Sequence, residues 1–185
     1  MKLLGLNSPS PWSRKVKLKR LLWIVTYYTL FRWTPPSWFG WRNTLLRCFG
    51  AIIDDTKIAP ARIWPDVQIY YPWFLRLGAA SIAGPGTRIY NLAMVTLEDG
   101  ANLSRHIHIC AGSHDLERWE MPLITVPITI GRNSWVGTDC FIGPGVTIGE
   151  ECVIGARSVV VGDQKARMIC VGHPCKPLKP RPPIR

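Results

Sequence analysis

The sequence predicts an all-β chain wound into a parallel β-helix, preceded by a helical arm and followed by a short basic tail. The main observation is a six-residue period: an aliphatic residue followed by glycine recurs at positions 130, 136, 142, 148 and 154. Six is neither the helical period of 3.6 nor the strand period of 2. Hexapeptide periodicity is typical of a parallel β-helix, in which each turn contains three short strands. A β-sandwich would instead show hairpin turns such as Asn-Gly, which this chain lacks.

The same period is visible earlier in the chain, with two slips in register. One slip lies around Trp73, and the other makes the step from Ile89 to Leu97 eight residues. We expect such slips to be absorbed as bulges at the corners of the coil. The inward-pointing positions should be 63, 69, 77, 83, 89, 97, 103, 109, 130, 136, 142, 148, 154 and 160.

One segment leaves the pattern altogether. Residues 115–129, "DLERWEMPLITVPIT", separate the hexad at Ile109 from the one at Ile130, directly after "AGSHD". A regular solenoid does not need an excursion of this length, and such excursions are usually functional. We therefore divide the chain into an arm (1–50), a β-helix with its excursion (51–162) and a C-terminal extension (163–185).

The arm contains a predicted helix over residues 13–33, "SRKVKLKRLLWIVTYYTLFRW". Its apolar run from Leu21 to Phe31 is shorter than the roughly 20 residues that span a bilayer. A cationic start with an aromatic body suits a helix lying in the interface of an anionic membrane. The alternative is an amphipathic helix packed on its own domain or on a neighbouring subunit. "TPPSWFGW" should end the helix.

The charge distribution and the cysteine content indicate which partners and which cell compartment to expect. The net charge is +11, concentrated in "SRKVKLKR" and "KPLKPRPPIR". Basic ends suggest contact with membrane lipid, a phosphorylated ligand or nucleic acid, although solubility alone could explain them. No nucleic-acid-binding module is recognisable, so we expect no nucleic acid partner. Six cysteines without a CxxC pair, and no evident secretory signal, predict reduced core thiols in a cytoplasmic protein.

Several segments together resemble a known family. They are "YPW" (71–73), "IYNLAMVTLEDG" (89–100), "CAGSHD" (110–115), the repeats over 127–160 and "VGHPCKPLKPR" (171–181). They resemble the left-handed β-helix acyltransferases, above all the colanic-acid-biosynthesis type of O-acetyltransferase, and more distantly the galactoside, maltose and xenobiotic acetyltransferases. The resemblance implies a left-handed coil, a homotrimer with active sites between neighbouring prisms, acetyl-CoA as donor, and a sugar or lipid-linked sugar hydroxyl as acceptor. It implies a cytoplasmic enzyme of exopolysaccharide biosynthesis, with peripheral contact at the inner face of the membrane as an added expectation.

The resemblance assigns the catalytic histidine to His114. It is the sixth residue of its hexad, so we expect it at an outward corner, just before the excursion. Acetyl transfer to a hydroxyl needs a base, and a histidine titrates near neutrality and suits that role. Asp115 either orients the imidazole or caps the turn. An oxyanion donor could be Ser113 or a backbone N–H near it, and the sequence does not choose.

The resemblance also implies binding residues. Trp135, expected at an outward corner, and Asn91 match acceptor-side positions, although Asn91 could instead stack within the coil. Thr138 and Ala156 match positions that meet the pantetheine arm of CoA, and Lys176 and Lys179 match positions near its phosphates. Two departures from the family pattern concern CoA contacts: "GNP" reads Gly172-His173-Pro174, and a frequent Lys is Gly162. Arg157 and Lys165 are further basic candidates without motif support.

Two alternatives remain at this level. His106, His108 and Cys110 alternate along one predicted strand and could hold zinc, as γ-type carbonic anhydrases do on the same coil. The usual histidine pair separated by four residues is missing, so we expect no metal. The other alternative is a non-catalytic, membrane-attached trimeric scaffold.

Overall fold

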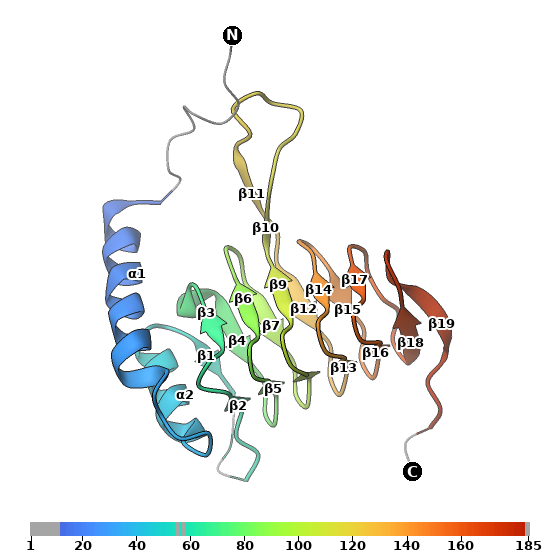
Figure 1. Cartoon of the computed structure of the whole chain (residues 1–185), viewed down its shortest axis with the longest axis horizontal. Coiled ribbons are helices and arrows are strands. Elements are labelled where there is room, and N and C mark those ends of the chain that lie inside the picture. The colour runs from blue at the N-terminus through green and yellow to red at the C-terminus, as the bar shows by residue number, and fades with distance from the viewer. Residues whose placement is uncertain (1–11, 55, 57, 184–185) are drawn as a thin grey trace.

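In the computed structural model, which describes residues 12–54, 56 and 58–183, three sheets form the sides of a prism, and their strands are parallel except for β19 at one edge (Figure 1). Sheet A contains β1 (Ile52–Ile53), β4 (Leu75–Leu77), β7 (Val95–Leu97), β12 (Ile128–Ile130) and β15 (Thr147–Ile148). Sheet B contains β2 (Arg62–Ile63), β5 (Ile82–Ala83), β8 (Asn102–Leu103), β13 (Trp135–Val136), β16 (Val153–Ile154), β18 (Met168–Val171) and β19 (Lys176–Pro180). Sheet C contains β3 (Gln68–Ile69), β6 (Arg88–Tyr90), β9 (His108–Cys110), β14 (Phe141–Ile142) and β17 (Val159–Val160). The chain visits sheets A, B and C in turn, which makes a parallel β-helix as predicted.

The six-residue period builds the prism interior. Each inward position stacks on its equivalent one coil away, as Leu97 does on Leu77 and Val136 on Leu103. Burying a chain of aliphatic side chains is the main stabilising contribution of such a core. Every predicted inward position is buried: Ile63, Ile69, Leu77, Ala83, Ile89, Leu97, Leu103, Ile109, Ile130, Val136, Ile142, Ile148, Ile154 and Val160.

The departures from the period share one corner of the prism, where the chain passes from sheet C to sheet A; we call it the C–A corner. The first slip is a 3₁₀ turn, η2 (Pro72–Phe74), and the second is the irregular segment 91–94 one coil later. The third departure, on the coil after that, is the long excursion. The slips are therefore corner features, as the register predicted.

Two helices and a π-helical turn cover the N-terminal end of the prism (Figure 1). They are α1 (Arg14–Thr26), which continues as η1 (Tyr27–Phe31), and α2 (Phe39–Cys48). The predicted helix is thus confirmed, with Ser13 accepting a hydrogen bond from the N–H of Val16 as its N-cap. One stripe of it is buried at Trp23, Tyr27 and Phe31, which join the prism core. Among the described residues, no helix has the length and apolar character that crossing a membrane requires.

No coil precedes the first one, so its carbonyls have no backbone N–H groups of an earlier coil to accept from, and side-chain donors take their place. Elsewhere, backbone N–H groups of one coil donate to carbonyls of the next. The carbonyls of the first coil receive Arg42 Nε–H (at Ile63, 2.7 Å), Asn43 Nδ2–H (at Ala61, 2.9 Å) and Trp23 Nε1–H (at Ile69, 2.6 Å). Because buried carbonyls need partners, these three side chains supply donors along the edge of the prism, and Arg47 Nη2–H adds another at Ile53 (3.2 Å).

Six free cysteines include four in the core, as predicted from their spacing. Cys152 and Cys170 lie in adjacent coils with their Sγ atoms 3.8 Å apart. Burial raises the pKa of the Cys152 thiol to about 12 and that of Cys175 to about 11. These groups are protonated at neutral pH and act as small apolar side chains.

Candidate active site

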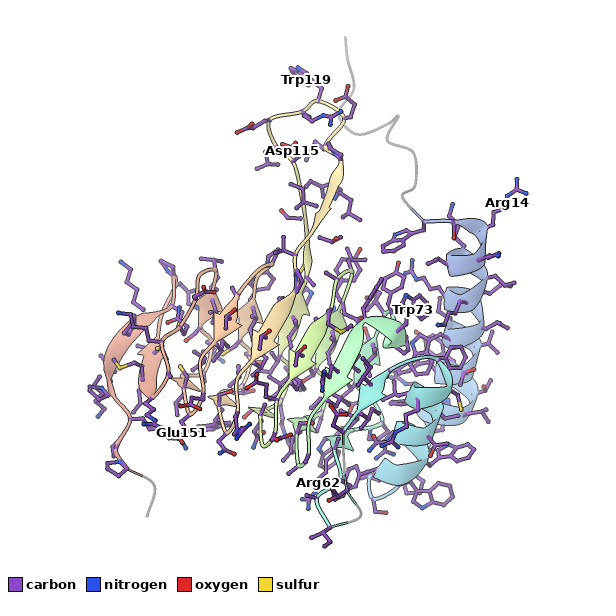
Figure 2. The ribbon with its side chains drawn as sticks, turned by 180° about the vertical axis from the view of Figure 1, so that it is seen from behind. Arg14, Arg62, Trp73, Asp115, Trp119 and Glu151 are labelled. Atoms are coloured by element: carbon purple, nitrogen blue, oxygen red, sulfur yellow. The ribbon has the colours of Figure 1, made fainter. Side chains whose placement is uncertain are left out.

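The excursion forms a hairpin that stands away from the prism (Figures 1 and 2). Its strands are β10 (Gly112–His114) and β11 (Leu123–Thr125), which pair antiparallel and leave the body at the C–A corner. Asp115 and Trp119 lie at its far end (Figure 2). The hairpin begins at Gly112, three residues before the predicted excursion. His114 therefore lies on a hairpin strand instead of the coil corner that the hexad position predicted.

The imidazole of His114 is oriented by the hairpin itself. Its Nδ1 lies 2.6 Å from the carbonyl oxygen of Met121, across the hairpin. A carbonyl can only accept, so Nδ1 must carry the proton and Nε2 must hold a lone pair. The His114 side chain is exposed. In the neutral imidazole, Nε2 can therefore accept a proton from a group bound beside the hairpin.

Asp115 follows His114 but does not contact its ring. Its Oδ1 accepts a hydrogen bond from the N–H of Glu117 at 3.0 Å, and its own N–H donates to the carbonyl of Pro122. This is the turn-capping arrangement of an Asx turn. Of the two roles considered for Asp115, the geometry favours the cap, since the Met121 carbonyl already orients the imidazole.

Asn91 lies at the same corner one coil earlier and is fully buried. Its Oδ1 accepts from the N–H of Tyr71, and its Nδ2 donates to the carbonyls of Tyr71 and Phe74. The carboxamide therefore ties the 3₁₀ turn to the next coil. In this arrangement Asn91 supports the corner beneath the hairpin and does not reach solvent.

Trp135 lies on β13 of sheet B with its ring facing outward. Its side chain is 48% exposed, and its Nε1–H donates to Ser104 Oγ at 2.8 Å on the neighbouring coil. It is a strand residue instead of a corner residue, but it has the predicted outward orientation. A fixed, half-exposed indole is a suitable wall for a ligand ring.

Thr138 and Ala156 stack at the corner between sheets B and C, the B–C corner. Thr138 Oγ1 donates to the carbonyl of Arg105 at 3.0 Å, and both residues are exposed. The coils pass closely here, because a Cβ on Gly137 would lie 2.7 Å from the backbone nitrogen of Ala156. The small Ala156 side chain leaves a shallow surface on which an extended chain could lie.

Exposed basic side chains lie on β19 and at two corners of the later coils. Lys176 and Lys179 are exposed on β19. Arg157 is exposed at the B–C corner, with its Nε 4.0 Å from Asp139, while its carbonyl contacts the His173 ring. Lys165 is also exposed. Lysine and arginine on one sheet and one corner could pair with phosphate groups.

The candidate residues fall into two groups on one chain. His114, Asp115 and Asn91 belong to the C–A corner, whereas Trp135, Thr138, Ala156, Lys176 and Lys179 belong to sheet B and the B–C corner. Sheet B is the side of the prism opposite the C–A corner, and in Figure 1 β13 and β16 lie at the edge away from the hairpin. A single chain therefore does not bring together His114, the predicted base, and Trp135, the predicted ligand wall.

The zinc alternative finds no support in the geometry. His108 is on β9, but His106 lies in the preceding turn with φ 59°, so the two do not share a strand face. Within residues 12–54, 56 and 58–183, no three His, Cys, Asp or Glu side chains gather as metal ligands would.

Two contributors to the site were missed in the sequence. The contact of Met121 with His114 is made by its backbone carbonyl, so the residue type at position 121 does not reveal it. Met121 does adopt φ 44°, which holds the turn. Ser104, the partner of Trp135, precedes it by 31 residues because the hairpin interrupts the coil. The hexad register, counted across the excursion, would have found it.

A parallel β-helix with an exposed, oriented histidine on a hairpin defines a class: the hexapeptide-repeat transferases. Residues 127–162 match the family model described as bacterial transferase hexapeptide (six repeats). The Escherichia coli (strain K12) protein named "Putative colanic acid biosynthesis acetyltransferase WcaF" is 36% identical over 179 residues, covering 97% of this chain and 96% of the relative. This chain belongs to the hexapeptide-repeat acetyltransferase family.

Two further relatives agree with that assignment. The galactoside O-acetyltransferase of Escherichia coli (strain K12) is 28% identical over 152 residues, covering 80% of this chain and 73% of that protein. A solved structure of galactoside acetyltransferase in complex with coenzyme A superposes with a TM-score of 0.80 at 27% identity, covering 92% of this chain and 84% of the other. The coil accordingly has the left-handed fold of these acetyltransferases.

Proposed function

We propose that this chain transfers an acetyl group from acetyl-CoA to a sugar hydroxyl in the biosynthesis of an exopolysaccharide of the colanic acid type. The observation that carries the proposal is His114, whose Nδ1–H is held by the Met121 carbonyl so that Nε2 can accept a proton. The full-length similarity to the colanic acid relative supports the acceptor class.

The reaction that these residues support begins with proton removal. His114 Nε2 accepts the proton of the acceptor hydroxyl as its oxygen attacks the acetyl carbonyl. Acetyl-CoA, when bound, supplies an activated thioester. The resulting imidazolium, still held through Nδ1, then returns its proton to the departing sulfur. The Met121 carbonyl keeps the ring oriented during this exchange, since Nδ1–H can donate to it in both the neutral and the charged form.

The donor side also fits the chemistry of CoA. Ala156 and Thr138 offer a shallow corner to the extended pantetheine arm, and a larger side chain at 156 would occupy that surface. Lys176, Lys179 and Arg157 provide cations for the phosphates. Trp135 provides a wall for the sugar ring on the same side.

The function is tested by following thiol release. The purified chain is incubated with acetyl-CoA and a panel of sugars and lipid-linked sugars, and free CoA is measured together with acetylated product. We expect release that depends on one acceptor class. A chain that binds no CoA would contradict the enzyme and favour the scaffold alternative.

We also propose a homotrimer, because one chain separates the two halves of the site. A contact between the C–A corner of one copy and sheet B of the next is heterologous, and such contacts close into rings. The hairpin supports this idea: an isolated two-stranded hairpin is marginally stable in water. Its tip exposes Leu116 (80%) and Trp119 (61%), which a neighbouring copy could cover.

Mixing two inactive variants tests the shared site. His114→Ala removes the base, and Ala156→Trp blocks the donor corner; each alone should be inactive. Dissociated and reassembled together at equal amounts, they should recover about a quarter of the wild-type rate, because random assembly joins intact halves at about one interface in four. His114→Ala reassembled with itself is the control. No recovery, despite mixed oligomers seen by native mass spectrometry, would place the site within one chain.

We further propose that the arm contacts an anionic membrane. One face of α1 and η1 packs on the prism, but the other exposes a set of apolar side chains: Leu18, Leu21, Leu22, Val25, Tyr28 and Leu30. Arg14, Lys15 and Lys17 occupy its first turns, with no acidic residue there. Cations at a helix N-terminus oppose the helix dipole by roughly 0.3–1 kcal/mol each, so helix stability does not explain them. Attraction to anionic lipid does.

Point variants test this contact better than deletion, because deletion would remove Trp23, Tyr27 and Phe31 from the core. Leu21→Ser combined with Val25→Ser should lower partitioning onto phosphatidylglycerol vesicles by about tenfold or more, given about 1.5 kcal/mol or more per buried apolar side chain. Val161→Ser with Leu178→Ser, exposed elsewhere, is the matched control. Co-sedimentation measures both. Equal binding by the two double variants would refute the membrane role of the arm.

A further inference from the structure

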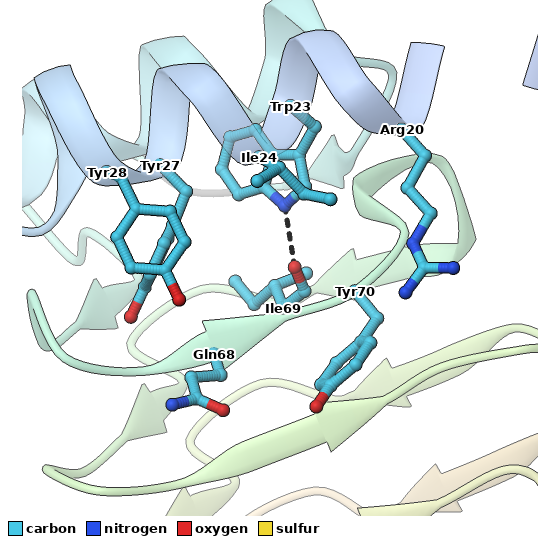
Figure 3. A pocket seen from close by; sticks show the side chains of 8 residues that line it. All are labelled: Arg20, Trp23, Ile24, Tyr27, Tyr28, Gln68, Ile69 and Tyr70. Carbon is cyan, nitrogen blue, oxygen red and sulfur yellow. Dashed lines mark hydrogen bonds between the residues drawn. The ribbon is translucent and has the colours of Figure 1, made fainter. Parts of the chain in front are cut away.

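A pocket of about 200 Å³ lies between the arm and the first coil of sheet C (Figure 3). Trp23 and Ile24 of α1 form its roof, and Gln68 and Tyr70, at and just beyond β3, form its floor. Arg20 stands at one end and Tyr28 at the other (Figure 3). Neither the acetyl transfer chemistry nor the hairpin uses this pocket.

The inner wall of the pocket is rigid. The Trp23 Nε1–H donates to the carbonyl of Ile69 at 2.6 Å, which fixes the helix over the coil. The rings of Tyr70 and Tyr90 meet edge to face, with centroids 4.8 Å apart. A preformed wall lowers the entropy that ordering a ligand would cost.

The charge at the pocket is unbalanced. The Arg20 guanidinium lies 5.1 Å from the Tyr71 ring centroid and 6.0 Å from that of Tyr70, so it stacks on aromatic faces. In the described part of the chain, no carboxylate lies within 4 Å of it. A guanidinium stacked by its face can still offer N–H groups in its plane to a phosphate.

The pocket opens onto the exposed side of the arm. Ile24 and Tyr28 line it and are also partly exposed, next to Leu21 and Val25. At about 200 Å³ it is smaller than the roughly 300–1,000 Å³ of sites that enclose a whole small molecule. It therefore suits one part of a larger ligand whose remainder lies along the helix. Tyr28 is 56% exposed at the rim of the pocket, and exposed tyrosine side chains are typical of proteins at the lipid interface.

We propose that this pocket binds the phosphoglyceride head region of one anionic phospholipid. The phosphate pairs with Arg20, ester oxygens accept from the Tyr28 hydroxyl and the Gln68 amide, and the acyl chains pass over Ile24 onto the exposed face of α1. The proposal rests on the membrane contact proposed above. It adds to the general attraction between the arm and anionic lipid a specific site for one lipid per chain. It places the enzyme on its membrane in one defined orientation.

The test uses a soluble short-chain lipid, so that bilayer partitioning does not contribute. Dihexanoyl phosphatidylglycerol, below its micelle concentration, is titrated into the full chain by calorimetry. We expect saturable binding of one lipid per chain. Three probes should each bind at least about tenfold more weakly. Glycerol 3-phosphate lacks the acyl esters, dihexanoylglycerol lacks the phosphate, and methyl galactoside lacks both.

Variants separate the site from general charge. Arg20→Gln should weaken binding by about tenfold or more, the effect of one charge-assisted hydrogen-bonded pair. Lys17→Gln, the same charge loss on the same helix outside the pocket, should change it by less than about twofold. Ile24→Glu should abolish binding, whereas Val161→Glu, at an exposed position just after β17 and away from the arm, should not. Thermal melts check that each variant is folded.

The outcomes distinguish the proposals. Absence of saturable lipid binding, or equal loss in Arg20→Gln and Lys17→Gln, would overturn the pocket while leaving vesicle binding intact. Tighter binding of glycerol 3-phosphate or of the sugar than of the lipid would also overturn it. Thiol release from acetyl-CoA, measured on the same variants, reports the catalytic proposal separately.

Discussion

Replacing His114 with alanine should lower the acetyl transfer rate by about 10²–10⁴-fold, the usual contribution of a general base. The reason is geometric: Nε2 of His114 is the ring nitrogen that the Met121 carbonyl leaves able to accept a proton. CoA affinity should stay unchanged, because the proposed contacts to CoA come from Thr138, Ala156 and the basic side chains, and not from His114. Steady-state rates and direct CoA titration measure the two quantities separately.

A matched control for that experiment is His108→Ala. His108 is exposed on sheet C, where its ring meets Phe141 edge to face. It lies on the strand immediately before the hairpin but has no part in the proposed chemistry, so its variant should keep the wild-type rate within about twofold. A full transfer rate in His114→Ala would remove His114 from the mechanism.

Replacing Arg42 with methionine should cost about 3–5 kcal/mol of the free energy of unfolding, the usual effect of breaking a buried charged network. Arg42 is fully buried. It donates to the carbonyls of Ile63, Pro35 and Pro36 and to the Thr34 hydroxyl. Methionine matches its length but leaves these acceptors without a donor.

The control for Arg42 is the same substitution at an exposed position on the second coil. Arg88→Met, on β6, should cost less than about 1 kcal/mol. Urea unfolding at one fixed protein concentration compares the two, because association would otherwise contribute to the measured stability. Equal losses for Arg42→Met and Arg88→Met would show that the edge of the first coil needs no side-chain donor.

The coil was predictable because a single physical demand recurs along it. Each inward position, such as Leu97 or Ile142, must be apolar to stack on its neighbours. The six-residue period is therefore visible in the sequence as a regular recurrence of aliphatic residues. The arm was predictable as a helix but not in its packing. Both of its faces are apolar, so nothing in the pattern distinguishes Trp23, which is buried, from Leu22, which is exposed.

The site was predictable only where residue type and position carried the information. The motif singled out His114 as a candidate, but the orientation of its ring depends on the backbone carbonyl of Met121, which any residue would supply. Asn91 shows the converse: its type matched a ligand-contacting position, yet its carboxamide is occupied by the backbone of Tyr71 and Phe74. The direction of a side chain follows from its neighbours in space, which a linear motif does not contain.

The side-chain donors on the first coil have a consequence for solubility. A stack of parallel coils ends in a row of hydrogen-bonding groups, and such a row can template growth by further chains into a fibre. Arg42, Asn43 and Trp23 occupy that row at one end, and at the other end sheet B finishes in β19, an exposed edge strand that contains Pro177 and Pro180. Proline has no N–H to donate, so both features oppose the addition of a further strand in register.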